Sequence, residues 1–229
     1  AIKLGIIRCD KHPFAYTKIP IPEPRSLDIS VDAIRKIISA DVSKSKQLSL
    51  AKDMFLLSFY LGGINYADLI QVDLSEDVIS YIRLKSGEHK TKNRTTSIAV
   101  CPEAKNIINK YIGKNGKLKF DYKYTAGNLQ RYINKCLKLL ATELNIKEGL
   151  TFYSARKTFA QFASEIGIPY PIIEYCLGHS IKTSITINSY VRVKQHQADA
   201  AIQRVIEYIN NPEVFKPYIE MRAQMQMMM

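Results

Sequence analysis

Apolar side chains recur at helical spacing in one segment after another of this 229-residue chain. The pattern predicts helices over residues 31–40, 47–61, 102–111, 125–144, 196–210 and 212–225. Residues 78–84 and 96–100 are short, mainly apolar segments that are joined by the polar KSGEHKTKNRT. This pattern predicts a β-hairpin. Segment 47–61 is strongly apolar, so we expect it at the centre of the core. The expected fold is mainly α with a small antiparallel β-sheet (α+β).

The side chains best suited to chemistry lie between residues 150 and 190. Thr151 is expected to cap a helix whose first turn carries Tyr153, Arg156 and Lys157. The positive end of a helix, with cations added to it, is a ready binding site for a phosphate group. We therefore expect this turn to bind phosphate.

A second short helix is expected over 172–177, ending at Gly178 and exposing His179 on its C-terminal side. Tyr190 follows eleven residues after His179. A tyrosine can act as a nucleophile when nearby cations stabilise its phenolate and the transition state. Each residue also has a structural interpretation: Tyr190 as a surface tyrosine, His179 as a helix-end cap and Arg156 as a generic phosphate contact.

The order of these motifs resembles the C-terminal box of the tyrosine recombinase family, the phage and transposon integrases. That family has H-x-x-R, then L-G-H, then a nucleophilic Tyr. The matching residues here are Y-S-A-R at 153–156, L-G-H at 177–179, and Tyr190. Tyr153 stands where the family has His, and Tyr190 lies slightly further from L-G-H than usual.

The family's first arginine is missing at its expected place. G-I-N-Y-A-D-L at 63–69 fits the family's frame, but Asn65 occupies the arginine position. An arginine binds a phosphate oxygen through a two-pronged contact that asparagine cannot replace. Arg83 and Arg94 are the candidates to substitute for it.

The resemblance also implies a lysine in the turn of the small sheet. Lys85, in R-L-K-S at 83–86, matches the family's R-x-K-T pattern, and Lys90 and Lys92 are alternatives. The competing interpretation is an exposed basic hairpin that makes generic phosphate contacts.

The resemblance implies one role for each residue. Tyr190 attacks the scissile phosphate and forms a 3′-phosphotyrosyl intermediate, while Arg156 and His179 bind its non-bridging oxygens. Lys85 protonates the departing 5′ oxygen, and Tyr153 occupies the general-base corner. No cofactor and no metal ion is needed for this chemistry.

The charge of the chain agrees with a nucleic-acid partner. Lys and Arg number 33 against 21 acidic residues, the net charge is +12 and the pI is about 9.4. Such an excess favours a polyanion, and tyrosines interleaved with cations suit a surface that grips a DNA backbone. A basic cytosolic protein with a solvated surface is the alternative interpretation.

Two other reaction classes are not indicated. Asp68, Asp73, Glu76 and Asp77 are interpreted as a cap and a solvated turn rather than as a two-metal site. Gly62-Gly63 lacks the Lys-Ser/Thr of a phosphate loop, so nucleotide hydrolysis is not expected. No small-molecule substrate is indicated.

The compartment is predicted from cysteine spacing and hydropathy. Cys9, Cys101, Cys136 and Cys176 show no ligand spacing and are expected as reduced, packed thiols. No apolar run approaches the roughly 20 residues that span a bilayer, so no membrane association is expected. We expect a cytoplasmic protein.

The domain organisation is inferred partly from the resemblance. Residues 1–27, rich in proline, are interpreted as a linker from an upstream DNA-binding domain, 28–220 as the catalytic domain and 221–229 as a disordered tail. The expected partner is double-stranded DNA, on which a solution monomer assembles into a tetramer. The last helix would dock on a neighbouring protomer or, as we expect, pack within its own chain.

The sequence thus predicts an enzyme for site-specific DNA recombination, a mobile-element integrase or transposase. The alternative is a DNA-binding regulator or accessory factor on the same fold that no longer cleaves, because Asn65 replaces an arginine.

Overall fold

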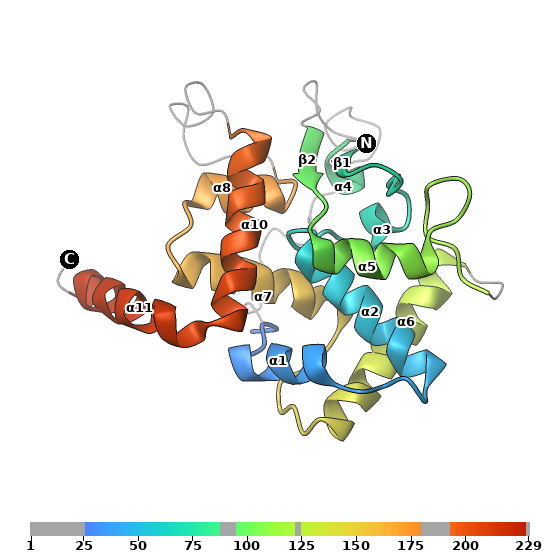
Figure 1. Cartoon of the computed structure of the whole chain (residues 1–229), viewed down its shortest axis with the longest axis horizontal. Coiled ribbons are helices and arrows are strands. Elements are labelled where there is room, and N and C mark those ends of the chain that lie inside the picture. Colours follow the sequence, from blue (N-terminus) through green and yellow to red (C-terminus); the bar gives the residue numbers. More distant parts are fainter. Residues whose placement is uncertain (1–25, 88–94, 122–124, 180–192, 228–229) are drawn as a thin grey trace, which may run out of the picture.

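The computed structural model describes residues 26–87, 95–121, 125–179 and 193–227. Its elements are shown in Figure 1 and follow one another as α1 Val31–Ser39, α2 Lys46–Tyr60, α3 Tyr66–Leu69, β1 Val78–Ile82, α4 Leu84–Gly87, β2 Thr95–Ala99, α5 Pro102–Tyr111, α6 Ala126–Glu143, α7 Phe152–Glu165, α8 Tyr170–Cys176, α10 Gln195–Asn210 and α11 Pro212–Met227. The described chain is therefore mostly helical with one two-stranded antiparallel sheet. The predicted fold class is confirmed.

Helix α2 is the centre of the core, as its apolar sequence predicts. It packs against α5, α6 and α7. Phe59 meets Phe159 and Phe162 of α7 edge to face, with ring centroids 6.0 Å and 6.3 Å away. Edge-to-face rings add to the free energy gained by burying them, by about 0.5–1.5 kcal/mol for each pair. This packing fixes α7, which carries Arg156.

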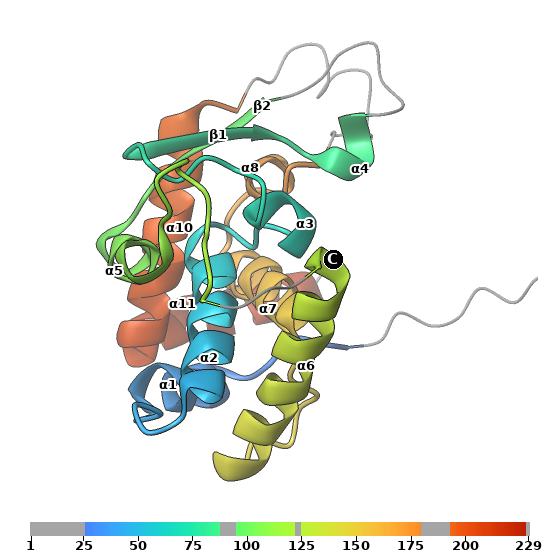
Figure 2. The ribbon, with the colours of Figure 1, turned by 90° about the vertical axis from the view of Figure 1, so that its right-hand side faces the viewer.

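The sheet lies across one end of the helices (Figure 2). Ile79 pairs with Ile98 in its register, and both are buried because alternate side chains of each strand face the core. The outer edge of β2 is closed by side chains from two helices. The Ser97 amide donates to the Tyr175 hydroxyl at 3.0 Å, and the Ala99 amide donates to Asp199 at 2.8 Å. These bonds hold α8 and α10 against the sheet.

The element bounds differ from the predicted ones in a few places. α5 matches the prediction at both ends, since Pro102 begins the helix where a proline costs no hydrogen bond. The first strand ends at Ile82, and Leu84 begins the short helix α4 instead of continuing the strand. The prediction that the strand extends to 84 is wrong, because the Leu84 amide donates to Asp68 rather than to β2. α8 begins at Tyr170, earlier than predicted.

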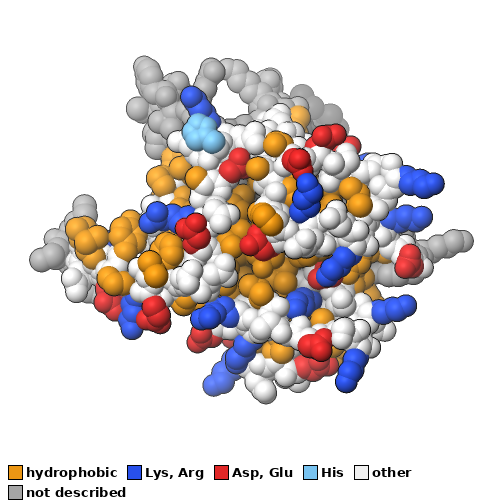
Figure 3. All heavy atoms as spheres, viewed as in Figure 1, with side chains coloured by type: hydrophobic (Ala, Val, Ile, Leu, Met, Phe, Trp, Pro, Cys, Tyr) orange, Lys and Arg blue, Asp and Glu red, His pale blue; other side chains and the backbone are white. Residues whose placement is uncertain are grey.

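The last helix, α11, packs on its own chain. Arg222 donates to the Ser164 carbonyl at the end of α7 at 2.9 Å, and Phe215 contacts Tyr208 of α10 with ring centroids 5.4 Å apart. α11 continues as helix to Met227, into the segment for which a disordered tail is expected from sequence. Apolar side chains gather over this helix in Figure 3, and Val214 is 75% exposed.

No helix in the described ranges combines the length and apolar character needed to cross a membrane. The described cysteines, Cys101, Cys136 and Cys176, are free thiols, and Cys136 and Cys176 are buried as predicted. Cys9 lies outside the described residues.

Candidate functional site

The L-G-H motif forms a tight stop at the end of α8. Gly178 adopts the left-handed conformation, with φ of +64°. Its amide donates to the Tyr175 carbonyl at 2.9 Å, and the His179 amide donates to the Glu174 carbonyl at 2.8 Å. This pair of bonds is the Schellman motif, in which glycine is favoured because it has no Cβ. The motif places His179 directly over the last turn of its own helix.

Arg156 is the buried centre of the site. It lies on α7 and is only 4% exposed. Its guanidinium donates to the Gly63 carbonyl at 2.7 Å and to the Leu177 carbonyl at 2.6 Å. These acceptors belong to the turn between α2 and α3 and to the end of α8. Arg156 therefore joins three parts of the chain that are distant in sequence.

The turn at Gly63 is shaped for this contact. Gly63 has φ of +77°, and a Cβ at this position would lie 3.1 Å from the Arg156 Cα. Such close backbone approach leaves room for glycine and little else. The Gly-Gly sequence that ends α2 therefore also positions the α7 arginine.

His179 bridges Arg156 and an acid. One nitrogen of the guanidinium lies 2.9 Å from Nε2 of His179, and the Glu174 carboxylate lies 3.0 Å from Nδ1. Burial is the main cause that lowers the pKa of His179, and the charges of Arg156 and Arg83 lower it further. The Glu174 hydrogen bond acts in the opposite direction. His179 is half-buried, not simply exposed at the helix end as the sequence predicts.

Arg83 approaches the same point from the end of β1. A Cβ built on Gly178 would lie 3.5 Å from the Cβ of Arg83 and 3.6 Å from its Cδ. Its positive charge acts on both Arg156 and His179. Within the described part of the chain, the Arg83 Nε is buried and has no hydrogen-bond partner. A buried donor without a partner is costly, so this atom has an unused capacity to donate a hydrogen bond.

Asp68 holds the segment that carries Arg83. It is 5% exposed, and its Oδ1 accepts the Leu84 amide at 2.9 Å. Leu84 stands between Arg83 and Lys85, so one carboxylate fixes the backbone between two cations. Asp68 is therefore buried rather than solvated, and its carboxylate caps the first amide of α4 from sixteen residues away in the chain.

The electrostatic balance around Arg156 favours an anion. Burial lowers the pKa of its guanidinium and the nearby charge of Arg83 lowers it further, whereas Tyr81, Tyr153 and Asp68 raise it. Arginine nonetheless stays charged in proteins. Two guanidinium groups held close together in a partly buried place are stabilised when a phosphate binds between them.

The other predicted residues that the structure describes differ in exposure and in the element that carries them. Lys85 is exposed on α4, and Tyr153 is 46% exposed on the first turn of α7. Lys157 is half-buried on the next turn of α7. Asn65 caps α3, its side-chain oxygen accepting the Tyr66 amide at 2.8 Å.

The first turn of α7 offers fewer free amides than the sequence predicts. Thr151 forms the predicted cap and accepts the Ser154 amide at 3.3 Å. The Phe152 amide donates to Asn134 of α6 at 2.8 Å. Because these amides already have partners, a phosphate at this turn would be bound by side-chain cations rather than by the helix end.

Four of the predicted residues cannot be placed relative to this centre. Tyr190, Lys90, Lys92 and Arg94 lie outside the described residues. Among the residues that are described, no group of three or more His, Cys, Asp and Glu side chains is placed to hold a metal ion.

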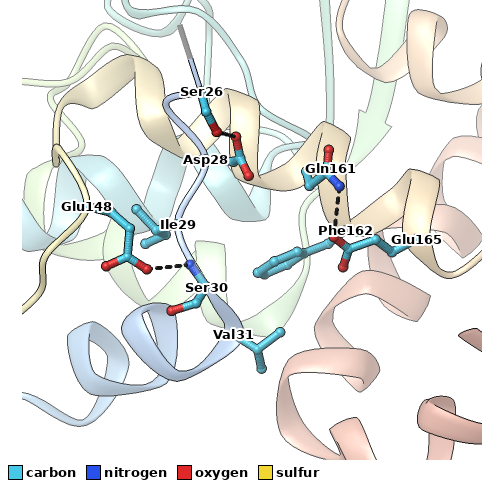
Figure 4. Close-up of a pocket in the computed structure, with 9 residues that line it drawn as sticks. All are labelled: Ser26, Asp28, Ile29, Ser30, Val31, Glu148, Gln161, Phe162 and Glu165. Carbon is cyan, nitrogen blue, oxygen red and sulfur yellow. Dashed lines mark hydrogen bonds between the residues drawn. The ribbon is translucent and has the colours of Figure 1, made fainter. Parts of the chain in front are cut away.

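A cavity of about 410 Å³ lies elsewhere, between α7 and the residues leading into α1 (Figure 4). Asp28, Glu148 and Glu165 line it. Glu148 already accepts the Ser30 amide at 3.1 Å, and Glu165 accepts from Gln161 at 2.8 Å. Three carboxylates repel a phosphate, so this cavity is not a candidate for binding DNA.

A second cavity, of about 390 Å³, lies nearer to the cationic centre. Lys157, Glu174 and Leu177 are among the residues that line it. It gives solvent access to the acid that contacts His179.

The comparisons with known proteins bear on the fold. No protein-family model and no curated protein matches the sequence. The integrase from mycobacterium phage Brujita matches in structure with a TM-score of 0.55 at 14% identity, over 82% of this chain and 60% of the integrase. A XerA recombinase matches with a TM-score of 0.48 at 19% identity, over 85% of this chain and 68% of that protein.

This chain therefore spans about 60% of the length of the integrase it matches. At this level of identity the likeness shows the fold alone. The chain has a tyrosine recombinase fold, as the order of its sequence motifs predicts.

Proposed function

We propose that this chain is the catalytic domain of a tyrosine site-specific recombinase, which cleaves and rejoins DNA through a covalent phosphotyrosine. The observation that carries the proposal is the convergence of Arg83, Arg156 and His179. They lie directly after β1, on α7 and in the turn that follows α8, in a fold shared with a phage integrase. A cluster of this kind suits one phosphodiester group.

Each member of the cluster has a proposed role. Arg156 and His179 bind the non-bridging oxygens of the scissile phosphate. Arg83 takes the place of the arginine that Asn65 replaces, since its Nε is buried without a partner while Asn65 is committed to capping α3. Its guanidinium provides the two-pronged contact that an asparagine lacks.

The proposed reaction needs no energy from another molecule. The Tyr190 phenol oxygen attacks the phosphorus, forming a new P–O bond as the bond to the 5′ oxygen breaks. Tyr153 occupies the position of the general base, but a neutral phenol is a very weak base, so the phenol proton of Tyr190 passes to water. Lys85 supplies a proton to the departing 5′ oxygen. A free phenol has a pKa of about 10, so the clustered cations must stabilise the developing negative charge. Attack by a 5′-hydroxyl reverses the step and restores the DNA strand.

Double-stranded DNA is the proposed substrate, and the protein would act on it in the cytoplasm. The net charge of +12 supports binding to its phosphates. We infer a monomer in solution that assembles into a tetramer on DNA. Sedimentation of the protein without DNA would contradict this if it showed a stable tetramer.

The experiment that tests the proposed function is covalent trapping. The protein is incubated with a duplex carrying a nick next to the candidate crossover site, so that cleavage releases a short strand with a free 5′-hydroxyl, which diffuses away. The mixture is then separated by electrophoresis under denaturing conditions. Wild type should give a shifted protein–DNA band, and Tyr190→Phe should give none. Arg83→Lys should reduce the band by at least about 100-fold, since lysine keeps the charge but cannot make the two parallel hydrogen bonds of a guanidinium.

The matched control is Arg131→Lys, an exposed arginine on α6 whose side chain donates a hydrogen bond to its helix neighbour Asn128. It should trap like wild type. If wild type binds DNA but never forms the covalent band, the chain is a non-cleaving DNA-binding protein and the proposal is overturned. If Tyr190→Phe still traps, another residue is the nucleophile.

A further inference from the structure

Glu174 and His179 form a pair that the family pattern does not explain. Both belong to the end of α8, where the Schellman motif joins the Glu174 carbonyl to the His179 amide at 2.8 Å. Their side chains meet as well, with 3.0 Å between the Glu174 Oε2 and the His179 Nδ1. The side chains of both residues are about one-third exposed, at 34% and 32%. Backbone and side chain together therefore fix the carboxylate against the imidazole.

The neighbours of His179 determine where its proton lies. Arg156 can only donate hydrogen bonds, so the His179 Nε2 that it contacts at 2.9 Å must accept. The remaining hydrogen of a neutral imidazole is then on Nδ1 and is donated to Glu174. The DNA-free protein thus holds His179 neutral, in the Nδ1–H form.

This state is not the one that binds a phosphate oxygen. To donate a hydrogen bond from Nε2, His179 must gain a proton there while Nδ1 keeps its own. The result is an imidazolium between the phosphate and the Glu174 carboxylate. A carboxylate in contact with the far nitrogen stabilises this cation.

We propose that Glu174 is a positioning residue that makes phosphate binding at this site draw one proton from solvent onto the Nε2 of His179. When a phosphate oxygen accepts the hydrogen bond that Arg156 donates to His179, the Nε2 of His179 no longer accepts a hydrogen bond. Once protonated, it can donate one to the phosphate. Glu174 keeps the ring in place and balances its new charge. This inference rests on the proposed function, because it needs a DNA phosphate at the Arg83–Arg156–His179 cluster.

The charges around the imidazole set the direction of the effect. Arg156 on α7 and Arg83 at the end of β1 disfavour the imidazolium, and Glu174 on α8 favours it. Tyr81, Tyr153 and Asp68 face Arg156 rather than His179. A bound phosphate adds negative charge beside the two arginines, so it raises the pKa of His179 from its lowered value in the DNA-free protein.

The first test concerns the DNA-free protein. Long-range proton–nitrogen NMR correlations distinguish the two neutral imidazole forms, and the chain has only four histidines, so the His179 signals can be assigned with His179→Gln. The expected result is the Nδ1–H form at neutral pH. Finding the Nε2–H form would overturn the inference, because Arg156 could not then donate to Nε2.

The second test uses Glu174→Gln, which keeps the shape and an oxygen acceptor but removes the charge. The control is Glu143→Gln, an exposed acid on α6. Proton uptake on binding duplex DNA is measured by calorimetry in two buffers of different ionisation enthalpy, with Tyr190→Phe as the background to prevent cleavage. Uptake should approach one proton per site at about pH 8, above the ordinary pKa of histidine, and should fall in Glu174→Gln but not in Glu143→Gln.

The pH profile of covalent trapping separates this role from a structural one. Trapping should decline as pH rises through the pKa of His179 in the complex. Glu174→Gln should move that decline to lower pH by about one unit, and the two rates should converge in more acidic solution. An equal loss of rate at every pH would mean that Glu174 only supports the fold.

The outcomes of the two proposals can be told apart. A protein that never traps DNA but takes up a proton through Glu174 would refute the recombinase proposal and keep this one. Trapping with no proton uptake, and with no difference between Glu174→Gln and wild type, would refute this inference and keep the recombinase proposal.

Discussion

The replacement of Arg156 by lysine probes both the structure and the chemistry of the site. The arginine donates to two buried carbonyls, those of Gly63 and Leu177, at 2.7 Å and 2.6 Å. A lysine keeps the charge, but its single ammonium group cannot donate to both carbonyls as the two guanidinium nitrogens do. At least one of the two carbonyls is expected to lose its donor.

The cost follows from the kind of bond that is lost. A hydrogen bond from a charged donor contributes about 1.5–3 kcal/mol, and a buried carbonyl left without a partner costs about 1–3 kcal/mol. These contributions overlap, so we expect Arg156→Lys to lower the free energy of unfolding by about 2–4 kcal/mol. Domains of this size are stable by about 5–15 kcal/mol, so most of the variant should remain folded.

Equilibrium unfolding in urea measures the loss, with an unchanged slope showing that the unfolding reaction is the same. Covalent trapping, measured under conditions where the variant is folded, should fall by at least about 100-fold, because the proposal makes Arg156 a donor to the transition state. Arg131→Lys, the exposed control, should change stability by less than about 0.5 kcal/mol. A stability loss that small in Arg156→Lys would refute the claim that this guanidinium joins the three segments.

Two further substitutions test how the site is positioned. Gly63→Ala should destabilise the protein by about 1–2 kcal/mol from its left-handed backbone alone and should weaken trapping, whereas Gly149→Ala, where a Cβ would meet no atom within 4 Å, should be neutral in urea unfolding. Equal stability of the two variants would contradict the packing described at that turn. Asp68→Ala should cost about 1–3 kcal/mol, because the Leu84 amide loses its acceptor, and should lower trapping through the flanking cations. Trapping at the wild-type rate would show that Asp68 does not position them.

The sequence predicts the elements of this fold well because their signals are local. Pro102 and Gly178 mark helix ends through backbone geometry that only a few residues allow. Thr151 is identified as a cap by its position before a helical apolar pattern. The alternation at Ile79 and Ile98 likewise predicts a hairpin with one buried face.

Contacts between distant segments could not be predicted in the same way. Nothing in the local sequence shows that Asp68 accepts an amide sixteen residues later, which stops β1 short and begins α4. The burial of Arg156 could not be predicted from the sequence either, because its guanidinium donates to two main-chain carbonyls, which any sequence provides. Side-chain identity carries little information about such bonds.

Glu174 is a partial exception. It stands five residues before His179, and the glycine between them predicts the Schellman stop that brings the two together. The pair therefore has a local signal in the sequence. Arg83 is one of two candidates for the missing arginine, and only the fold shows that it lies close to Arg156 and His179.

The central proposal, that Tyr190 cleaves DNA at a phosphate bound by Arg83, Arg156 and His179, is tested most directly by locating the covalent adduct. The trapped complex is digested with protease and nuclease, and the peptide that carries the remaining nucleotide is sequenced by mass spectrometry. The account predicts a phosphotyrosyl bond at Tyr190, absent when Arg156 is replaced. An adduct on any other residue, or no adduct on DNA that the protein binds, would contradict it.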